Sequence, residues 1–159
     1  YSQSYREHKI PYIFDPGQQI SVLSGEQLTE MITGSELLIS NDYELEMIIQ
    51  ATGLGKDDLL ERTKAIISTF GEKGSLLRTQ QDEVEIPAAT ALQVLDPTGA
   101  GDAYRAGLIK GLILGKNLAD AARMGATCAS YAVERSGTQE HSFTDEGFWA
   151  RHLATFGET

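Results

Sequence analysis

The chain has 159 residues, which suits one domain with a sizeable core. Hydrophobic residues make up 41% and charged residues 23%, the profile of a soluble globular protein, and no apolar run approaches the roughly 20 residues that span a bilayer. The net charge of −10 and the scattered Lys and Arg residues argue against nucleic-acid binding. Cys128 is alone and cannot form an internal disulfide, so we expect a cytoplasmic protein with no membrane or nucleic-acid partner.

The first half of the chain alternates between short strands and helices. A polar, helix-like start without Met leads directly into a strand at 11–14, which the turn 15–17 ends, so we expect a fragment that lacks an N-terminal region. The segment 24–27 has capping-box spacing and predicts a helix to about residue 32. A strand at 37–40, helices at 42–51 and 57–64, and a strand at 65–69 follow.

The second half begins with a glycine turn at 71–74 and a predicted antiparallel hairpin of 75–79 and 83–86. A further strand is expected at 92–95, followed by long helices at 99–114 and 118–135 and a last helix that Thr144 caps. The alternation predicts one α/β domain over 1–159 with a largely parallel sheet. Ligands of such sheets bind at the carboxyl ends of the strands.

The sharpest motif is Asp96-Pro97-Thr98-Gly99-Ala100-Gly101-Asp102, which follows a predicted strand and opens a helix. Its glycines leave the backbone bare, and the first amides of a helix have no intrahelical acceptor, so this turn suits a phosphate. An acid at that place repels phosphate unless it has a role, and Asp102 could accept the proton of an attacking hydroxyl. The alternative is a simple cap in which Asp102 only favours the helix dipole.

Two other phosphate motifs fit less well. A dinucleotide fingerprint that starts at Gly99 needs a third glycine at position 104, which is Tyr104, and it should follow the first strand of a domain. A Walker A motif is absent, because neither Gly55-Lys56 nor Gly115-Lys116 is followed by Ser or Thr. A nicotinamide-dependent oxidoreductase is therefore a weaker alternative.

Four segments, in order, resemble the ribokinase-like (PfkB) family of carbohydrate and nucleoside kinases. They are Asn41-Asp42-Tyr43-Glu44, Thr69-Phe70-Gly71-Glu72-Lys73-Gly74, the run from Asp96 to Tyr104, and the stretch from Gly125 to Gln139. The resemblance covers nearly the whole chain but only the C-terminal half of the family's fold, a three-layer α/β domain with a mostly parallel sheet between helices. Within the family, the segment 14–18 and the residues Pro97 and Tyr104 look most like bacterial adenosine kinases.

The resemblance implies a role for each matching residue. Asp102 would be the catalytic base, and Gly99, Ala100 and Gly101 would supply the anion hole. ATP and Mg²⁺ would be held by Asn41, Glu44, Thr69, Gly71, Gly74 and Gly101, with Glu44 acting on Mg²⁺ indirectly. Asp96 and the carbonyls of Thr98, Arg135 and Gly137 would form a K⁺-type site.

Some readings remain open. Asn41 and Glu44 could be only a helix cap, the turn 69–74 only a connection between strands, and Ala126 stands where several relatives have a polar adenine contact. The family's residues for the acceptor, a sugar or nucleoside, lie in its N-terminal half. The chain is thus expected to be an ATP-dependent kinase fragment, or a fragment that binds nucleotide without catalysis, and to self-associate or to require the other half.

Overall fold

The computed structural model describes residues 1–157, which divide into two compact units. The first unit comprises Tyr1–Phe70 and Leu76–Val84, and the second comprises Gly71–Ser75 and the chain from Glu85 onward. Within the described residues, no helix is both long enough and apolar enough to cross a bilayer. The predicted α/β class is confirmed.

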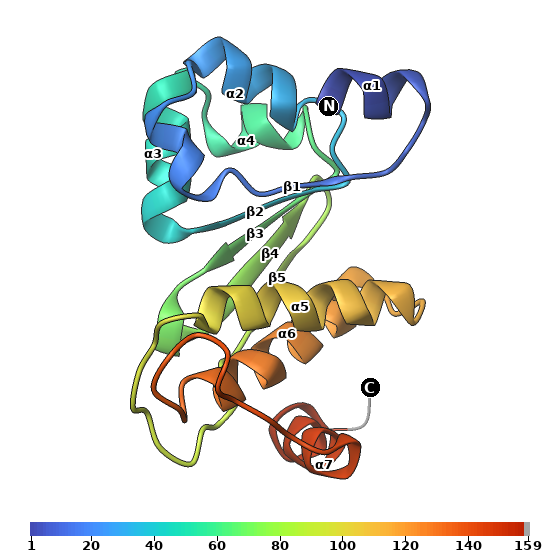
Figure 1. Ribbon diagram of the computed structural model, residues 1–159. Helices are drawn as coiled ribbons and strands as arrows, with labels where there is room; N and C mark the ends of the chain where they lie inside the picture. The colour runs from blue at the N-terminus through green and yellow to red at the C-terminus, as the bar shows by residue number, and fades with distance from the viewer. Residues whose placement is uncertain (158–159) are drawn as a thin grey trace. The chain divides into compact units, whose positions relative to one another are not determined.

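Five strands form one sheet in the order β1-β2-β3-β4-β5. They are β1 (Ile13–Phe14), β2 (Leu37–Asn41), β3 (Ala65–Thr69), β4 (Ser75–Thr79) and β5 (Glu83–Ile86) (Figure 1). The strands β1, β2 and β3 are parallel, with Leu38 opposite Ile66. The links 70–74 and 80–82 are too short for a parallel crossover, so β4 and β5 form the predicted hairpin and the sheet is mixed.

Three helices cover one side of β1, β2 and β3 in the first unit (Figure 1). They are α2 (Gly25–Ile32), α3 (Asp42–Thr52) and α4 (Lys56–Leu60), and a 3-10 turn, η1 (Gly17–Ser21), precedes them. Their apolar faces meet the strands in one core of Ile20, Leu28, Ile32, Leu38, Leu45, Ile48, Leu59, Leu60 and Ile66. The predicted capping box starts α2, because Ser24 Oγ accepts from Gln27 N at 3.2 Å and Gln27 Oε1 accepts from Ser24 N at 2.9 Å.

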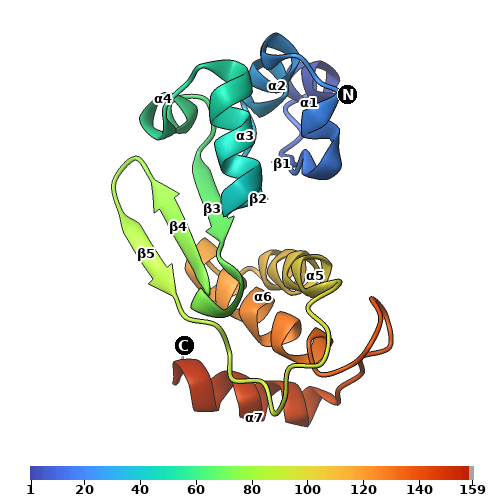
Figure 2. The same ribbon diagram turned by 90° about the vertical axis from the view of Figure 1, so that its left-hand side faces the viewer.

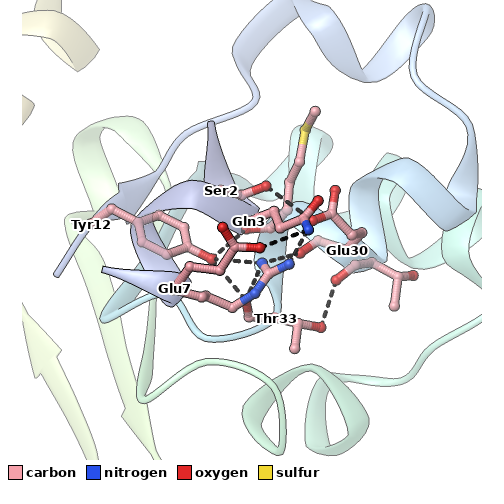
Figure 3. A network of polar contacts seen from close by, with 9 residues as sticks. Ser2, Gln3, Glu7, Tyr12, Glu30 and Thr33 are labelled. Atoms are coloured by element: carbon pink, nitrogen blue, oxygen red, sulfur yellow. Dashed lines mark hydrogen bonds and ion pairs between the residues drawn. The ribbon is translucent and has the colours of Figure 1, made fainter. Parts of the chain in front are cut away.

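The first helix, α1 (Ser2–Glu7), is tied to the end of α2 by Arg6. The Arg6 guanidinium donates to the carbonyls of Glu30 and Thr33 at 2.8 and 2.9 Å, and it forms an ion pair with Glu30 Oε1 at 2.6 Å. The Tyr12 hydroxyl also donates to Thr33 O, at 2.7 Å, so these groups gather at one helix end (Figure 3). Carbonyls that a helix C-terminus leaves without partners are thereby satisfied.

The second unit contains α5 (Ala100–Ile113), α6 (Leu118–Ala132) and α7 (Asp145–Phe156) (Figure 2). Small residues let α5 and α6 approach closely: a Cβ added to Gly107 would lie 2.6 Å from the carbonyl oxygen of Met124. The helix α7 packs on α6, and the buried His152 Nδ1 lies 3.0 Å from Thr127 Oγ1. Burial lowers the pKa of His152.

The prediction of a strand at 92–95 is wrong. This segment is exposed and irregular, and it is held to the end of α6: Leu95 N donates to Val133 O at 2.8 Å, and Leu92 N donates to Glu134 Oε1 at 2.7 Å. The helix predicted at 57–64 is shorter than expected and ends at Leu60. The residue Thr63, which was expected to be helical, instead forms a buried hydrogen bond of 2.8 Å with Ser35 just before β2.

Candidate functional site

In the first unit, the carboxyl ends of β2 and β3 bring two predicted site residues together. Asn41 is the last residue of β2, Thr69 is the last of β3, and the two are register partners in the parallel ladder. Both side chains are half-buried. The expectation that the motifs fall where parallel strands end is met here.

Asn41 and Glu44 form a reciprocal cap at the start of α3. Asn41 Oδ1 accepts from Glu44 N at 2.7 Å, and Glu44 Oε2 accepts from Asn41 N at 2.8 Å. The helix cap that the sequence offered as an alternative is therefore present. The cap is compatible with the predicted role in magnesium binding, because it holds a carboxylate at the end of the strand. Mg²⁺ in proteins is commonly bound through one or two carboxylates, waters and phosphate.

In the second unit, the turn before α5 opens a helix as the sequence motif predicts, but it follows the irregular segment after β5 and not a strand. Gly99 is the N-cap residue with φ of 82°, a conformation that favours glycine, and no side chain caps the helix. A Cβ on Gly99 would also lie 2.9 Å from the carbonyl oxygen of Thr138. Ala100 N donates to Pro97 O at 3.1 Å and Ala103 N to Gly99 O at 2.9 Å. By their position, the amides of Gly101 and Asp102 lack an intrahelical acceptor.

Two charged side chains, those of Asp102 and Arg105, lie at the first turns of α5. The side chain of Asp102 is exposed there. Sequence reasoning missed Arg105, whose guanidinium folds back so that a Cβ on Gly101 would lie 2.7 Å from its Nη1 atom. The spacing of four residues could have indicated it, because residues four apart lie on the same face of a helix and Gly101 leaves that face open to the Arg105 side chain. A cation and the helix dipole thus lie beside the expected anion hole.

Asp96 joins the turn before α5 to the loop after α6. Its Oδ1 accepts from Thr98 N at 2.9 Å, and its Oδ2 accepts from Gly137 N at 3.0 Å. Hydrogen bonds from the Thr98 side chain, then from the Gly137 and Thr98 amides, lower the pKa of Asp96 to about 2. Three predicted members of the cation site, Asp96, Thr98 and Gly137, are therefore brought together, and Arg135 lies two residues before Gly137.

The lowered pKa of Asp96 predicts a pH dependence of stability. A carboxyl group whose pKa is lower in the folded state stabilises the protein above its unfolded pKa of 3.8, and this contribution is lost as the pH falls toward 2. Urea unfolding of the parent and of Asp96→Asn should show a difference in free energy that shrinks between about pH 4 and pH 2. NMR titration of the Asp96 carboxyl carbon checks the assignment, and a midpoint near 3.8 would contradict it.

The turn after β3 contains a short 3-10 helix, η2 (Gly71–Lys73), and two glycines with different surroundings. Gly71 has φ of 59° and nothing within 4 Å of a Cβ added to it. Gly74 has φ of 89°, and an added Cβ would lie 2.1 Å from Ile86 O and 2.8 Å from Ala88 N. Gly74 is therefore required by packing against its own chain, whereas Gly71 leaves backbone open on the surface.

The predicted site residues are distributed over both units. Asn41, Glu44 and Thr69 belong to the first, while Gly71, Gly74 and all those from Asp96 onward belong to the second. No group of three or more His, Cys, Asp or Glu side chains within residues 1–157 could hold a metal ion. The third glycine of a dinucleotide fingerprint is replaced by Tyr104, which is buried and only 5% exposed.

Comparison with known proteins identifies the family. A model of the pfkB family of carbohydrate kinases matches residues 2–145. The chain is 42% identical over 126 residues to a nucleoside kinase of Methanocaldococcus jannaschii, covering 79% of this chain and 42% of that protein. It is 33% identical over 127 residues to a nucleoside kinase of Methanothermobacter thermautotrophicus, covering 79% of this chain and 40% of that protein.

Solved structures agree with these relatives. The Burkholderia thailandensis nucleoside kinase in complex with inosine superposes with a TM-score of 0.94 at 33% identity, over 99% of this chain and 52% of that one. The M. jannaschii nucleoside kinase gives a TM-score of 0.86 at 38% identity, over 91% of this chain and 48% of that one. The ribokinase-like fold expected from the motifs is confirmed, and the chain spans about half the length of these relatives.

Proposed function

Because this chain belongs to the pfkB family of carbohydrate kinases, we propose that it carries the nucleotide-binding and catalytic part of an ATP-dependent kinase. The acceptor is a hydroxymethyl group of a sugar or nucleoside. A nucleoside is favoured, because several relatives are nucleoside kinases and one of them was solved with inosine. Adenosine, the acceptor suggested by residues 14–18, Pro97 and Tyr104, belongs to the same proposal.

The observation that carries the proposal is the exposed carboxylate of Asp102 in the first turn of α5, beside amides without intrahelical acceptors. In the transfer, the acceptor oxygen forms a bond to the γ-phosphorus of ATP while the bond to the ADP oxygen breaks. Asp102 takes the proton of the acceptor hydroxyl. The turn from Gly99 to Gly101 stabilises charge on the equatorial oxygens through the Gly101 amide, because the Ala100 amide already donates to Pro97 O. Arg105 adds positive charge at the same turn.

The rest of the nucleotide is assigned to the strand ends and the glycine turn. Asn41, Glu44 and Thr69 would face Mg²⁺, its waters and the phosphates, because magnesium keeps several waters and needs few carboxylates. Gly71 would let the nucleotide approach the backbone, because nothing lies within 4 Å of its Cβ position. Gly74 has a packing role, so we assign it to the shape of the turn.

A monovalent cation such as K⁺ fits the loop that Asp96 joins. Asp96 accepts three hydrogen bonds, from the Thr98 side chain and from the Thr98 and Gly137 amides, and a carboxylate has about four acceptor positions, so one position remains for a cation. The carbonyls of Thr98, Arg135 and Gly137 would complete the site. Such a cation would add positive charge near the anion hole.

Release of ADP in the presence of an acceptor tests the proposal. We expect the chain, with ATP and Mg²⁺, to release ADP with inosine or adenosine and less with ribose or fructose. Binding of ATP without acceptor-dependent ADP would support the second candidate, a chain that binds nucleotide without catalysis. Absence of ATP binding in a titration would refute both candidates.

We also propose a cytoplasmic location, since the single cysteine suits a reducing compartment.

A further inference from the structure

One buried hydrogen bond in the second unit joins two of the proposed nucleotide-binding segments. The hydroxyl groups of Ser75 and Tyr104 lie 2.8 Å apart, and the two residues are 4% and 5% exposed. Ser75 follows Gly74 at the end of the glycine turn, and Tyr104 lies two residues after Asp102 in α5. The bond thus connects the turn to the helix that carries the proposed base.

The ring of Tyr104 is held in one place by close packing. A Cβ added to Gly125 of α6 would lie 3.2 Å from two ring carbons of Tyr104 and 2.7 Å from its carbonyl oxygen. The glycine therefore lets the ring lie close to α6, and the ring's hydroxyl reaches Ser75. On the other side of the bond, Gly74 packs against the backbone from Ile86 to Ala88.

Packing alone does not require the hydroxyl of Tyr104. A phenylalanine would fill the same space between α5 and α6, and a buried hydroxyl without a partner is costly. Burial raises the pKa of Tyr104 to about 12, so the group stays protonated at neutral pH and can donate or accept. What the hydroxyl adds is a directional contact with the turn.

We propose that Tyr104 is a positioning residue, which fixes the turn from Gly71 to Ser75 against the first turns of α5. This inference rests on the proposed function, in which the turn holds the nucleotide and α5 holds the transferred phosphoryl group. A ligand that contacts both segments needs a constant spacing between them, because small misplacements in a binding site have large effects. The bond acts through the turn and touches no substrate.

The proposal predicts a loss of affinity that depends on the length of the phosphate chain. In Tyr104→Phe, ATP should bind about three- to tenfold more weakly, the range expected for one buried hydrogen bond, whereas AMP should change less than about twofold. Ser75→Ala should have the same effect. The double variant should be no weaker than either single variant, because both changes remove one shared contact. Affinities are measured by calorimetric titration at a temperature where circular dichroism shows each variant folded.

Tyr12→Phe is the matched control. It also removes a hydrogen-bonded tyrosine hydroxyl, but at the end of α2, and its ATP affinity should equal that of the parent. A Tyr104→Phe variant that melts earlier yet binds ATP and AMP as the parent does would overturn the inference and leave only a structural role. Additive losses in the double variant would also overturn it. If the parent itself fails to bind ATP, both this inference and the proposed function are wrong.

Discussion

Replacement of Asp102 by asparagine is expected to lower turnover at least about 100-fold and to leave ATP affinity within about twofold of the parent. The asparagine has nearly the same shape but cannot accept the proton of the attacking hydroxyl. ATP affinity should persist because the amides of the helix start and the glycine turn are unchanged. Acceptor-dependent ADP release gives the turnover, and titration with ATP gives the affinity.

Asp145→Asn is the control for the charge that this change removes. Asp145 is also an exposed acid in the first turn of a helix, α7, so its loss has a similar effect on the helix dipole. We expect it to alter the free energy of unfolding by less than about 1 kcal/mol and turnover not at all. Near-normal turnover in Asp102→Asn, or an equal loss in Asp145→Asn, would show that Asp102 is not the base.

Alanine at Gly74 should destabilise the protein by about 3 kcal/mol or more, because the Cβ would overlap Ile86 O and the residue has positive φ. Alanine at Gly71 should cost only about 1 kcal/mol, since that residue shares the positive φ but has open space around it. Urea unfolding, followed by circular dichroism, measures both values. Equal costs at the two positions would contradict the packing role assigned to Gly74.

A second comparison, between Gly71 and Gly53, separates the effect on stability from the effect on ligand binding. Gly53→Ala is the matched control for Gly71→Ala: Gly53 ends α3 with φ of 70° and also has nothing within 4 Å. Both variants should lose similar stability, but only Gly71→Ala should weaken ATP binding. If Gly71→Ala binds ATP as Gly53→Ala does, the backbone of Gly71 does not contact the nucleotide.

Local sequence signals predicted most of the elements, because they reflect forces that act within a few residues. The capping boxes at Ser24 and Asn41 fixed where α2 and α3 begin, and the apolar runs of β2 and β3 gave their positions. The prediction of a strand at 92–95 failed because the apolar residues of this segment suggest a strand, whereas its amides donate to groups at the end of α6, far along the chain. No local pattern contains that partner.

In the candidate site, too, some features could be predicted from the sequence and others could not. The residues of the motifs were identified from their spacing and family resemblance, and the structure adds the contacts that join them. The family resemblance already placed Asp96 and Gly137 in one site, and the structure adds the hydrogen bond between them. The bond between Ser75 and Tyr104 joins residues far apart in sequence that no motif connects, so it could not be predicted from the chain alone. Gly74 shows the opposite case, in which a glycine of a binding motif proves to be needed for packing.

The reciprocal cap of Asn41 and Glu44 has a consequence for the energetics of ion binding. A glutamate that is mobile before it meets an ion loses up to about 2 kcal/mol of rotamer entropy on becoming ordered. Here the amide of Asn41 already holds one oxygen of Glu44, so this ordering belongs to folding rather than to binding. In the proposed function, the carboxylate would therefore meet a magnesium–nucleotide complex as a pre-organised group, and the hydrogen bond from Asn41 N would contribute to affinity by holding that carboxylate in place.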